Sequence, residues 1–112
     1  MNGYLTTHVL DTYRGRAGAG MDVVLTRDGR ELARTTTNAD GRTDEPLLDR
    51  DRFELGTYEL HFDVGSYFAG VAGAPDPPFL TVVTIRFSLT EDAHYHVPLV
   101  TSPWTYTTYR GS

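Results

Sequence analysis

Short runs of alternating apolar and polar residues, each closed by a turn signal, constrain the fold of this chain most. In residues 57–63 (TYELHFD), Tyr58, Leu60 and Phe62 fall on one face and polar side chains fall on the other. A period of two is typical of a strand with one buried face. Asp-Gly at residues 28–29 and NADG at residues 38–41 are strong tight-turn signals between such runs.

Runs of this kind, rich in β-branched and aromatic residues, recur along the whole chain. We expect strands over residues 4–11, 21–27, 30–37, 57–63, 79–89, 93–101 and 105–110, and a short strand from Thr43. Residues 66–73 lose the period of two and are expected to form the single short helix, whereas residues 11–20 form a Gly-rich surface loop. The pattern predicts an all-β fold, an antiparallel β-sandwich of seven to eight strands with one short helix, in a single domain over residues 1–112.

The same alternation predicts which side chains are buried. In the first strand, Leu5 and Val9 share one face, whereas Thr6 and His8 share the other. Most aromatic residues, Phe79 among them, are expected in the core because they follow the strand alternation.

Composition excludes several classes of protein. The 112 residues carry a net charge of -5, which disfavours nucleic acid as a partner. There is no cysteine for a disulfide or a thiolate metal site, and no lysine for Schiff-base chemistry. The first residues resemble no signal peptide, and no apolar run reaches the length of a membrane span. We therefore expect a cytoplasmic protein without membrane contact.

His94 and His96 lie one residue apart and share a strand face. Two histidines are too few for a zinc site, which would need further ligands from His8, His61 or a carboxylate. A second interpretation is that the histidines are simply exposed near a strand end. A third is general acid–base chemistry, because imidazole titrates near neutral pH.

Arg42 and the last four residues also allow two interpretations each. Arg42 is either a surface charge beside two carboxylates or a planar fork that holds an anionic or carbonyl-rich ligand. Tyr109, Arg110 and Ser112, with the terminal carboxylate, are either a frayed end or part of a binding site. The chain contains no Gly-x-Ser-x-Gly nucleophile motif and no His-Glu-x-x-His metal motif.

Five segments together resemble one known family over nearly the whole chain. They are LTTHVLDT at residues 5–12, NADGRTDEPLL at 38–48, GTYELHFDVGSYF at 56–68, HYHVPLV at 94–100 and SPWTYTTYRGS at 102–112. The family is that of the 5-hydroxyisourate hydrolases, the transthyretin-like enzymes of urate breakdown. The closing YRGS is the specific part, because the related hormone carrier transthyretin lacks it.

The resemblance implies a transthyretin-like sandwich that hydrolyses 5-hydroxyisourate to 2-oxo-4-hydroxy-4-carboxy-5-ureidoimidazoline. It implies no cofactor, no metal, and a homotetramer built as a dimer of dimers. The residues that match the family's site are His8, Arg42 and His96 as catalytic residues and Tyr109, Arg110, Gly111 and Ser112 as substrate-binding residues. His94 lies outside this set, and which histidine is base and which is acid stays open.

Two other classes of function compete with catalysis. A non-catalytic carrier would bind a planar ligand in a mostly apolar site. A general interaction sandwich would give no reason for Arg42 and the terminal tetrapeptide to occur together.

Overall fold

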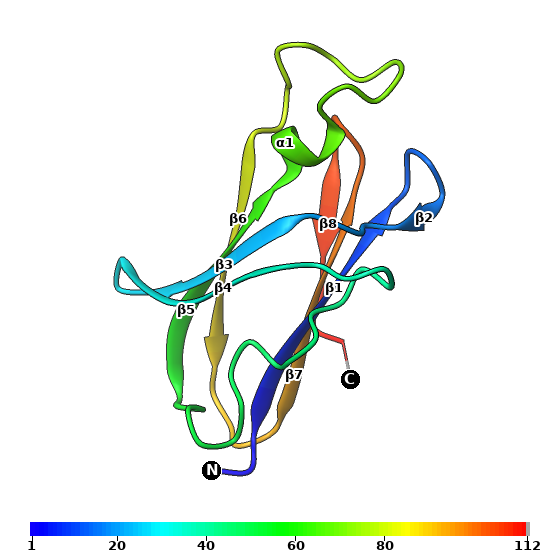
Figure 1. The fold of residues 1–112 in the computed structure, drawn as a ribbon. Coiled ribbons are helices and arrows are strands. Elements are labelled where there is room, and N and C mark those ends of the chain that lie inside the picture. Colours follow the sequence, from blue (N-terminus) through cyan, green and yellow to red (C-terminus); the bar gives the residue numbers. More distant parts are fainter. Residues whose placement is uncertain (112) are drawn as a thin grey trace.

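The chain folds into two four-stranded β-sheets and one short helix, which connects two strands of the same sheet (Figure 1). The structure is a computed structural model that describes residues 1–111. One sheet has the order β2-β1-β7-β8, and the other has the order β4-β3-β5-β6. The elements are β1 (Tyr4–Asp11), β2 (Arg16–Ala17), β3 (Asp22–Arg27), β4 (Arg30–Thr36), β5 (Gly56–Asp63), α1 (Val64–Phe68), β6 (Val82–Leu89), β7 (His94–Thr101) and β8 (Tyr106–Thr108).

One apolar core, formed mainly by alternate residues of both sheets, stabilises the sandwich. The predicted inward residues of β5 are at most 2% exposed, and Leu5 and Val9 of β1 are fully buried. Burying such side chains contributes on the order of 1.5–3 kcal/mol each. The other core members are Met21, Val23, Leu25, Leu47, Leu48, Phe53, Val64, Phe68, Val83, Ile85, Leu89, Tyr95, Val97 and Leu99. The predicted β-sandwich is therefore confirmed.

The prediction of a purely antiparallel arrangement is wrong at one pair of strands. β1 and β7 run parallel over their full length, from Tyr4 beside His94 to Asp11 beside Thr101. All other pairs of named strands in residues 1–111 are antiparallel. The strands of this parallel pair are far apart in the sequence, because the chain builds the whole second sheet between them. Local alternation does not encode the direction of such a distant neighbour.

The helix and the long strand begin at other residues than predicted. Helix α1 starts at Val64, directly after β5, because the Asp63 carboxylate accepts a hydrogen bond from the N–H of Ser66 and caps the first turn. Strand β6 starts at Val82 rather than at residue 79. Phe79 is 69% exposed, so the prediction that it belongs to the core is wrong. It follows two prolines, whose missing N–H groups do not support a strand ladder.

The edges of the sheet that contains β1 differ from the prediction as well. The Gly-rich loop after β1 contains the two-residue strand β2. No regular strand forms from Thr43; residues 41–48 instead run beside β1 and touch it through isolated bridges at Arg42 and Leu48. Strand β8 ends at Thr108. No helix within residues 1–111 is long and apolar enough to cross a membrane.

Candidate active site

Two histidines of β7 lie beside polar residues of β1 on the outer face of one sheet. The parallel register places Thr6 opposite His96 and Tyr4 opposite His94. The residues between them in each strand are buried, so these side chains point away from the core. His8 follows on the same face of β1. The structure thus confirms that His94 and His96 share one strand face.

The turn at residues 38–41 brings Arg42 to the edge of β1. The side-chain oxygen of Asn38 accepts a hydrogen bond from the N–H of Arg42 at 3.2 Å. Gly41 has φ 75°, and a Cβ at this position would collide with the backbone of β1. An isolated bridge then pairs Arg42 with His8. Two residues that are far apart in sequence are therefore brought together by one glycine turn.

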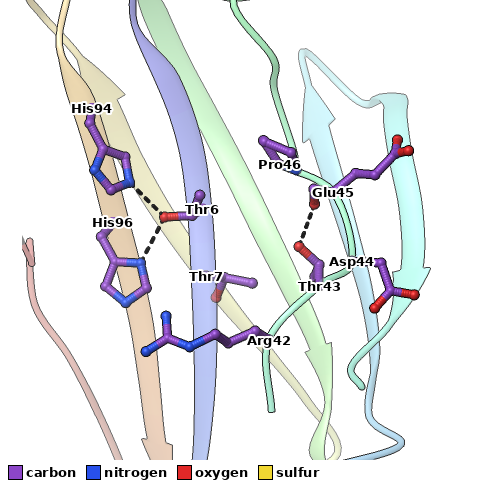
Figure 2. A pocket seen from close by; sticks show the side chains of 9 residues that line it. All are labelled: Thr6, Thr7, Arg42, Thr43, Asp44, Glu45, Pro46, His94 and His96. Atoms are coloured by element: carbon purple, nitrogen blue, oxygen red, sulfur yellow. Dashed lines mark hydrogen bonds between the residues drawn. The ribbon is translucent and has the colours of Figure 1, made fainter. Parts of the chain in front are cut away.

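A pocket of about 410 Å³ opens between this segment and β7 (Figure 2). Its volume suits a small planar ligand. All of its lining residues except one proline have polar side chains, and the lining consists of Thr6, Thr7, Arg42, Thr43, Asp44, Glu45, Pro46, His94 and His96. Such a lining favours the orientation of a polar molecule over the storage of an apolar one.

His8 lies next to this pocket, and its ring centroid is 6.5 Å from that of His96. The Nε2 atom of His8 is 3.1 Å from the backbone oxygen of Asp40. A carbonyl oxygen only accepts hydrogen bonds, so Nε2 of His8 carries the hydrogen. The neutral ring then presents Nδ1 as its hydrogen-bond acceptor.

The environment of His96 favours its neutral form. Burial lowers the pKa of the His96 imidazole below its ordinary value of 6.5, and the positive charge of Arg42 lowers it further. Interaction with His8 and His94 acts in the same direction. At neutral pH, His96 is therefore an uncharged ring that is available to take a proton.

We expect the His96 ring to titrate with a midpoint below 6.5 in the folded protein. The unfolded chain then binds more protons than the folded chain between the two pKa values. The contribution of His96 to stability is therefore fully present above pH 6.5 and is lost as the pH falls through the lower, folded pKa. A titration of the ring nitrogens by ¹H–¹⁵N NMR measures this midpoint, and a midpoint at or above 6.5 would contradict it.

The end of the described chain returns to His96. The N–H of Gly111 donates a hydrogen bond to the backbone oxygen of His96 at 2.7 Å. A Cβ on Gly111 would lie 2.9 Å from the His96 ring, closer than side chains pack. The glycine therefore allows the tail to lie against the imidazole. Ser112 lies outside the described residues.

Tyr109 and Arg110 do not enter the histidine pocket in this single chain. They line a separate pocket of about 210 Å³, together with residues of β6 and with Tyr95 and Val97 of β7. The Arg110 guanidinium donates to the Glu91 carboxylate at 3.0 Å and lies 4.0 Å from the ring centroid of Tyr95. Tyr95 occupies the opposite face of β7 from the two histidines. The predicted role of Arg110 in substrate binding therefore stays a prediction.

Sequence reasoning did not select Thr6, although its hydroxyl contacts both histidines of β7. The available signal was the period of two, which places Thr6 on the same face as His8. The structure does not place a third metal ligand beside the pair His94 and His96 within residues 1–111. Within residues 1–111, no three His, Asp or Glu side chains are grouped to hold one ion.

The fold and this polar pocket define the class of protein, a sandwich with a histidine–arginine site on the outer face of one sheet. The model of the HIUase/Transthyretin family matches residues 5–111. The chain belongs to this family.

Relatives that match nearly the full length of this chain include two 5-hydroxyisourate hydrolases. A 5-hydroxyisourate hydrolase of Deinococcus radiodurans is 56% identical, with 96% of this chain and 95% of the relative covered. The 5-hydroxyisourate hydrolase 2 of Rhizobium meliloti is 53% identical, with 99% and 98% covered.

Solved structures agree with the fold. The structure of an (S)-allantoin synthase has a TM-score of 0.89 at 39% identity and covers 98% of this chain, which spans only 44% of that protein's chain. The 5-hydroxyisourate hydrolase of Klebsiella pneumoniae has a TM-score of 0.84 at 34% identity, with 98% and 99% covered. Sea bream transthyretin in complex with thyroxine has a TM-score of 0.83 at 26% identity, with 96% and 93% covered. The fold is thus transthyretin-like.

Proposed function

We propose that this protein hydrolyses 5-hydroxyisourate to 2-oxo-4-hydroxy-4-carboxy-5-ureidoimidazoline in urate degradation. The observation that carries the proposal is a neutral His96 placed beside the charged Arg42 in an open polar pocket. Full-length relatives named as 5-hydroxyisourate hydrolases, at 56% and 53% identity, support the choice of substrate.

The proposed reaction begins with a water molecule placed between His8 and His96. Nδ1 of His8 accepts one hydrogen bond from the water, while His96 removes its other proton as general base. The water oxygen bonds to a ring carbonyl carbon, and the electron pair of the C=O bond moves to the oxygen. When this oxyanion collapses, the ring C–N bond breaks, and the leaving nitrogen takes a proton back from an imidazolium.

Arg42 has an electrostatic role in this scheme. Its guanidinium remains charged at all working pH values and donates several hydrogen bonds in one plane. A well-placed donor of this kind stabilises a developing oxyanion by about 3 kcal/mol. The pairing of Arg42 with His8, through the Gly41 turn, holds the cation beside the proposed water.

The tail is proposed to bind substrate through Tyr109, Arg110, Gly111 and Ser112. The contact of Gly111 with His96 supports this role, because it holds the tail beside the proposed base. The ion pair of Arg110 with Glu91 is half exposed, so it costs little to exchange for a ligand.

We also propose a homotetramer, a dimer of dimers, of single-domain subunits that act in the cytoplasm. The outer strands β6 and β8 offer unpaired backbone edges, and Tyr106 and Tyr109 are 45% and 58% exposed near one of them. Light scattering coupled to size exclusion measures the assembly. A monomer with full activity would disprove the tetramer and leave the catalytic proposal intact.

The direct test is turnover of freshly generated 5-hydroxyisourate, followed by absorbance with and without protein. Faster loss of substrate with protein supports hydrolysis. A carrier would bind a planar ligand without increasing this rate, and the polar lining of the pocket argues against it. No acceleration over the uncatalysed reaction would refute the proposed function.

A further inference from the structure

The hydroxyl of Thr6 lies between two imidazole rings (Figure 2). Its oxygen is 2.8 Å from Nε2 of His94 and 2.8 Å from Nδ1 of His96. Within residues 1–111, these two nitrogens are its only hydrogen-bond partners. The parallel register that places Thr6 opposite His96 makes the bridge possible, since the Thr6 side chain then stands between alternate residues of β7.

The number of hydrogens restricts how the three groups are connected. A hydroxyl has one hydrogen, so it donates to one ring while it accepts from the other. Only one arrangement leaves Nε2 of His96 free to take a proton: Nδ1–H of His96 donates to Thr6, and Thr6 donates to Nε2 of His94. The opposite arrangement places a hydrogen on Nε2 of His96 and removes its basic lone pair.

The first arrangement changes into the second when Nε2 of His96 takes up a proton and one proton moves through the bridge to His94. We propose that Thr6 is a positioning residue that holds His96 in its basic tautomer, and that His94 takes on the positive charge when His96 removes a proton from water. The proposal rests on hydrolysis with His96 as base.

The transfer is balanced atom by atom. Nε2 of His96 gains a proton from water as the water oxygen bonds to the substrate carbon. Nδ1 of His96 passes its own proton to the Thr6 oxygen, and the Thr6 hydrogen moves to Nε2 of His94. His96 ends neutral with its hydrogen on Nε2, Thr6 is again a hydroxyl, and His94 becomes the cation. The reverse transfer returns the proton when the leaving nitrogen needs it.

The surroundings of His94 suit a transient cation. By register, Arg42 lies level with His8. Along β7, His96 lies two residues away from this level and His94 lies four residues away. Two strand residues span about 7 Å, so the transfer moves positive charge away from Arg42. His94 stacks on Tyr4 with ring centroids 4.1 Å apart and an interplanar angle of 6°. The negative face of an aromatic ring attracts a cation.

Other charged groups lie around these rings. Asp44 and Glu45 line the same pocket, but Figure 2 shows their carboxylates directed away from His94 and His96. The Arg50 guanidinium lies 5.7 Å from the ring centroid of Tyr4 and opposes a cation on His94.

The test compares Thr6→Val, which removes the hydroxyl at nearly constant volume, with Thr6→Ser, which retains it. We expect Thr6→Val to lower kcat by about 10- to 100-fold, the range found for partners that orient metal-bound imidazoles, and Thr6→Ser to restore most of the loss. His94→Phe retains an aromatic ring on Tyr4 but has no proton acceptor. We expect it to lower kcat as much as Thr6→Val does. The double variant Thr6→Val/His94→Phe should lose no more than the larger single loss, because both changes break one relay.

The matched control is Thr26→Val. The Thr26 hydroxyl is 2.9 Å from Nε2 of His61. This is a similar threonine–histidine hydrogen bond, but it lies on the other sheet, away from the site. This variant should retain normal kcat. The relay would be overturned if the decrease in kcat of the double variant equalled the product of the two single decreases. Equal decreases in kcat for Thr6→Val and Thr6→Ser would also overturn it.

A measurement without turnover separates this proposal from the proposed function. Long-range ¹H–¹⁵N NMR above the His96 titration should show the hydrogen of the neutral His96 ring on Nδ1. A hydrogen on Nε2 would overturn the tautomer assignment even if the protein hydrolyses 5-hydroxyisourate. Conversely, absence of hydrolysis with the Nδ1–H tautomer present would refute the function and the relay while leaving the positioning by Thr6 in place.

Discussion

Replacement of His96 with alanine is expected to lower kcat for 5-hydroxyisourate by about 10²- to 10⁴-fold, the range that a general base contributes. His96 is the pocket histidine whose pKa is lowered by burial and by Arg42, so it is neutral where hydrolysis would run. The measurement is initial-rate kinetics over a range of pH. In the unaltered protein the acidic limb of the pH–rate profile should lie below pH 6.5, and in the variant it should disappear.

The matched control for this experiment is His61→Ala. His61 lies on β5 of the other sheet, and its two ring nitrogens also contact threonine hydroxyls, at 2.9 Å each. Its removal should leave kcat unchanged. His8→Ala should also reduce turnover, because His8 supplies the second acceptor for the water. Near-native turnover in both His8→Ala and His96→Ala would show that the catalytic assignment is wrong.

Replacement of Arg42 with glutamine is expected to have two separable effects. Loss of the guanidinium should lower kcat by about 10²- to 10³-fold, the cost of removing one oxyanion donor. It should also raise the pKa of His96, because the positive charge that disfavours the imidazolium is gone. Burial, the largest cause of the shift, remains, so the midpoint should rise but stay below 6.5.

Kinetics and NMR titration of the same Arg42 variant measure both effects. Arg42→Lys should recover the pKa of His96 more than it recovers kcat, since lysine keeps the charge but loses the planar fork. Arg34→Gln is the control: Arg34 is an exposed arginine of β4 that pairs with Glu31 at 2.7 Å. It should change neither quantity. An unchanged kcat in Arg42→Gln would remove Arg42 from the mechanism.

Several features of the site were predictable from local sequence alone. Side-chain alternation is a steric property of a strand, so it places His94 with His96 on one face of β7 and Thr6 with His8 on one face of β1. The turn before Arg42 was predictable as well, because glycine is the residue that adopts φ 75° without strain.

Two predicted strand boundaries were wrong because the segments concerned do not join a sheet. Phe79 is apolar and precedes a strand, yet it is exposed, because the backbone after two prolines does not join the sheet. The short strand expected from Thr43 does not form, and this segment meets β1 only at isolated bridges.

By itself, the sequence determined which side chains face the core and which face solvent, and its motifs determined the family resemblance. Only the tertiary structure decided that β1 and β7 run parallel, that Thr6 joins His94 to His96, and that Arg110 pairs with Glu91 outside the histidine pocket. The physical reason is the range of the forces involved. The face of a side chain follows from the geometry of its own strand, whereas the neighbour of a strand is selected by burial of the whole core.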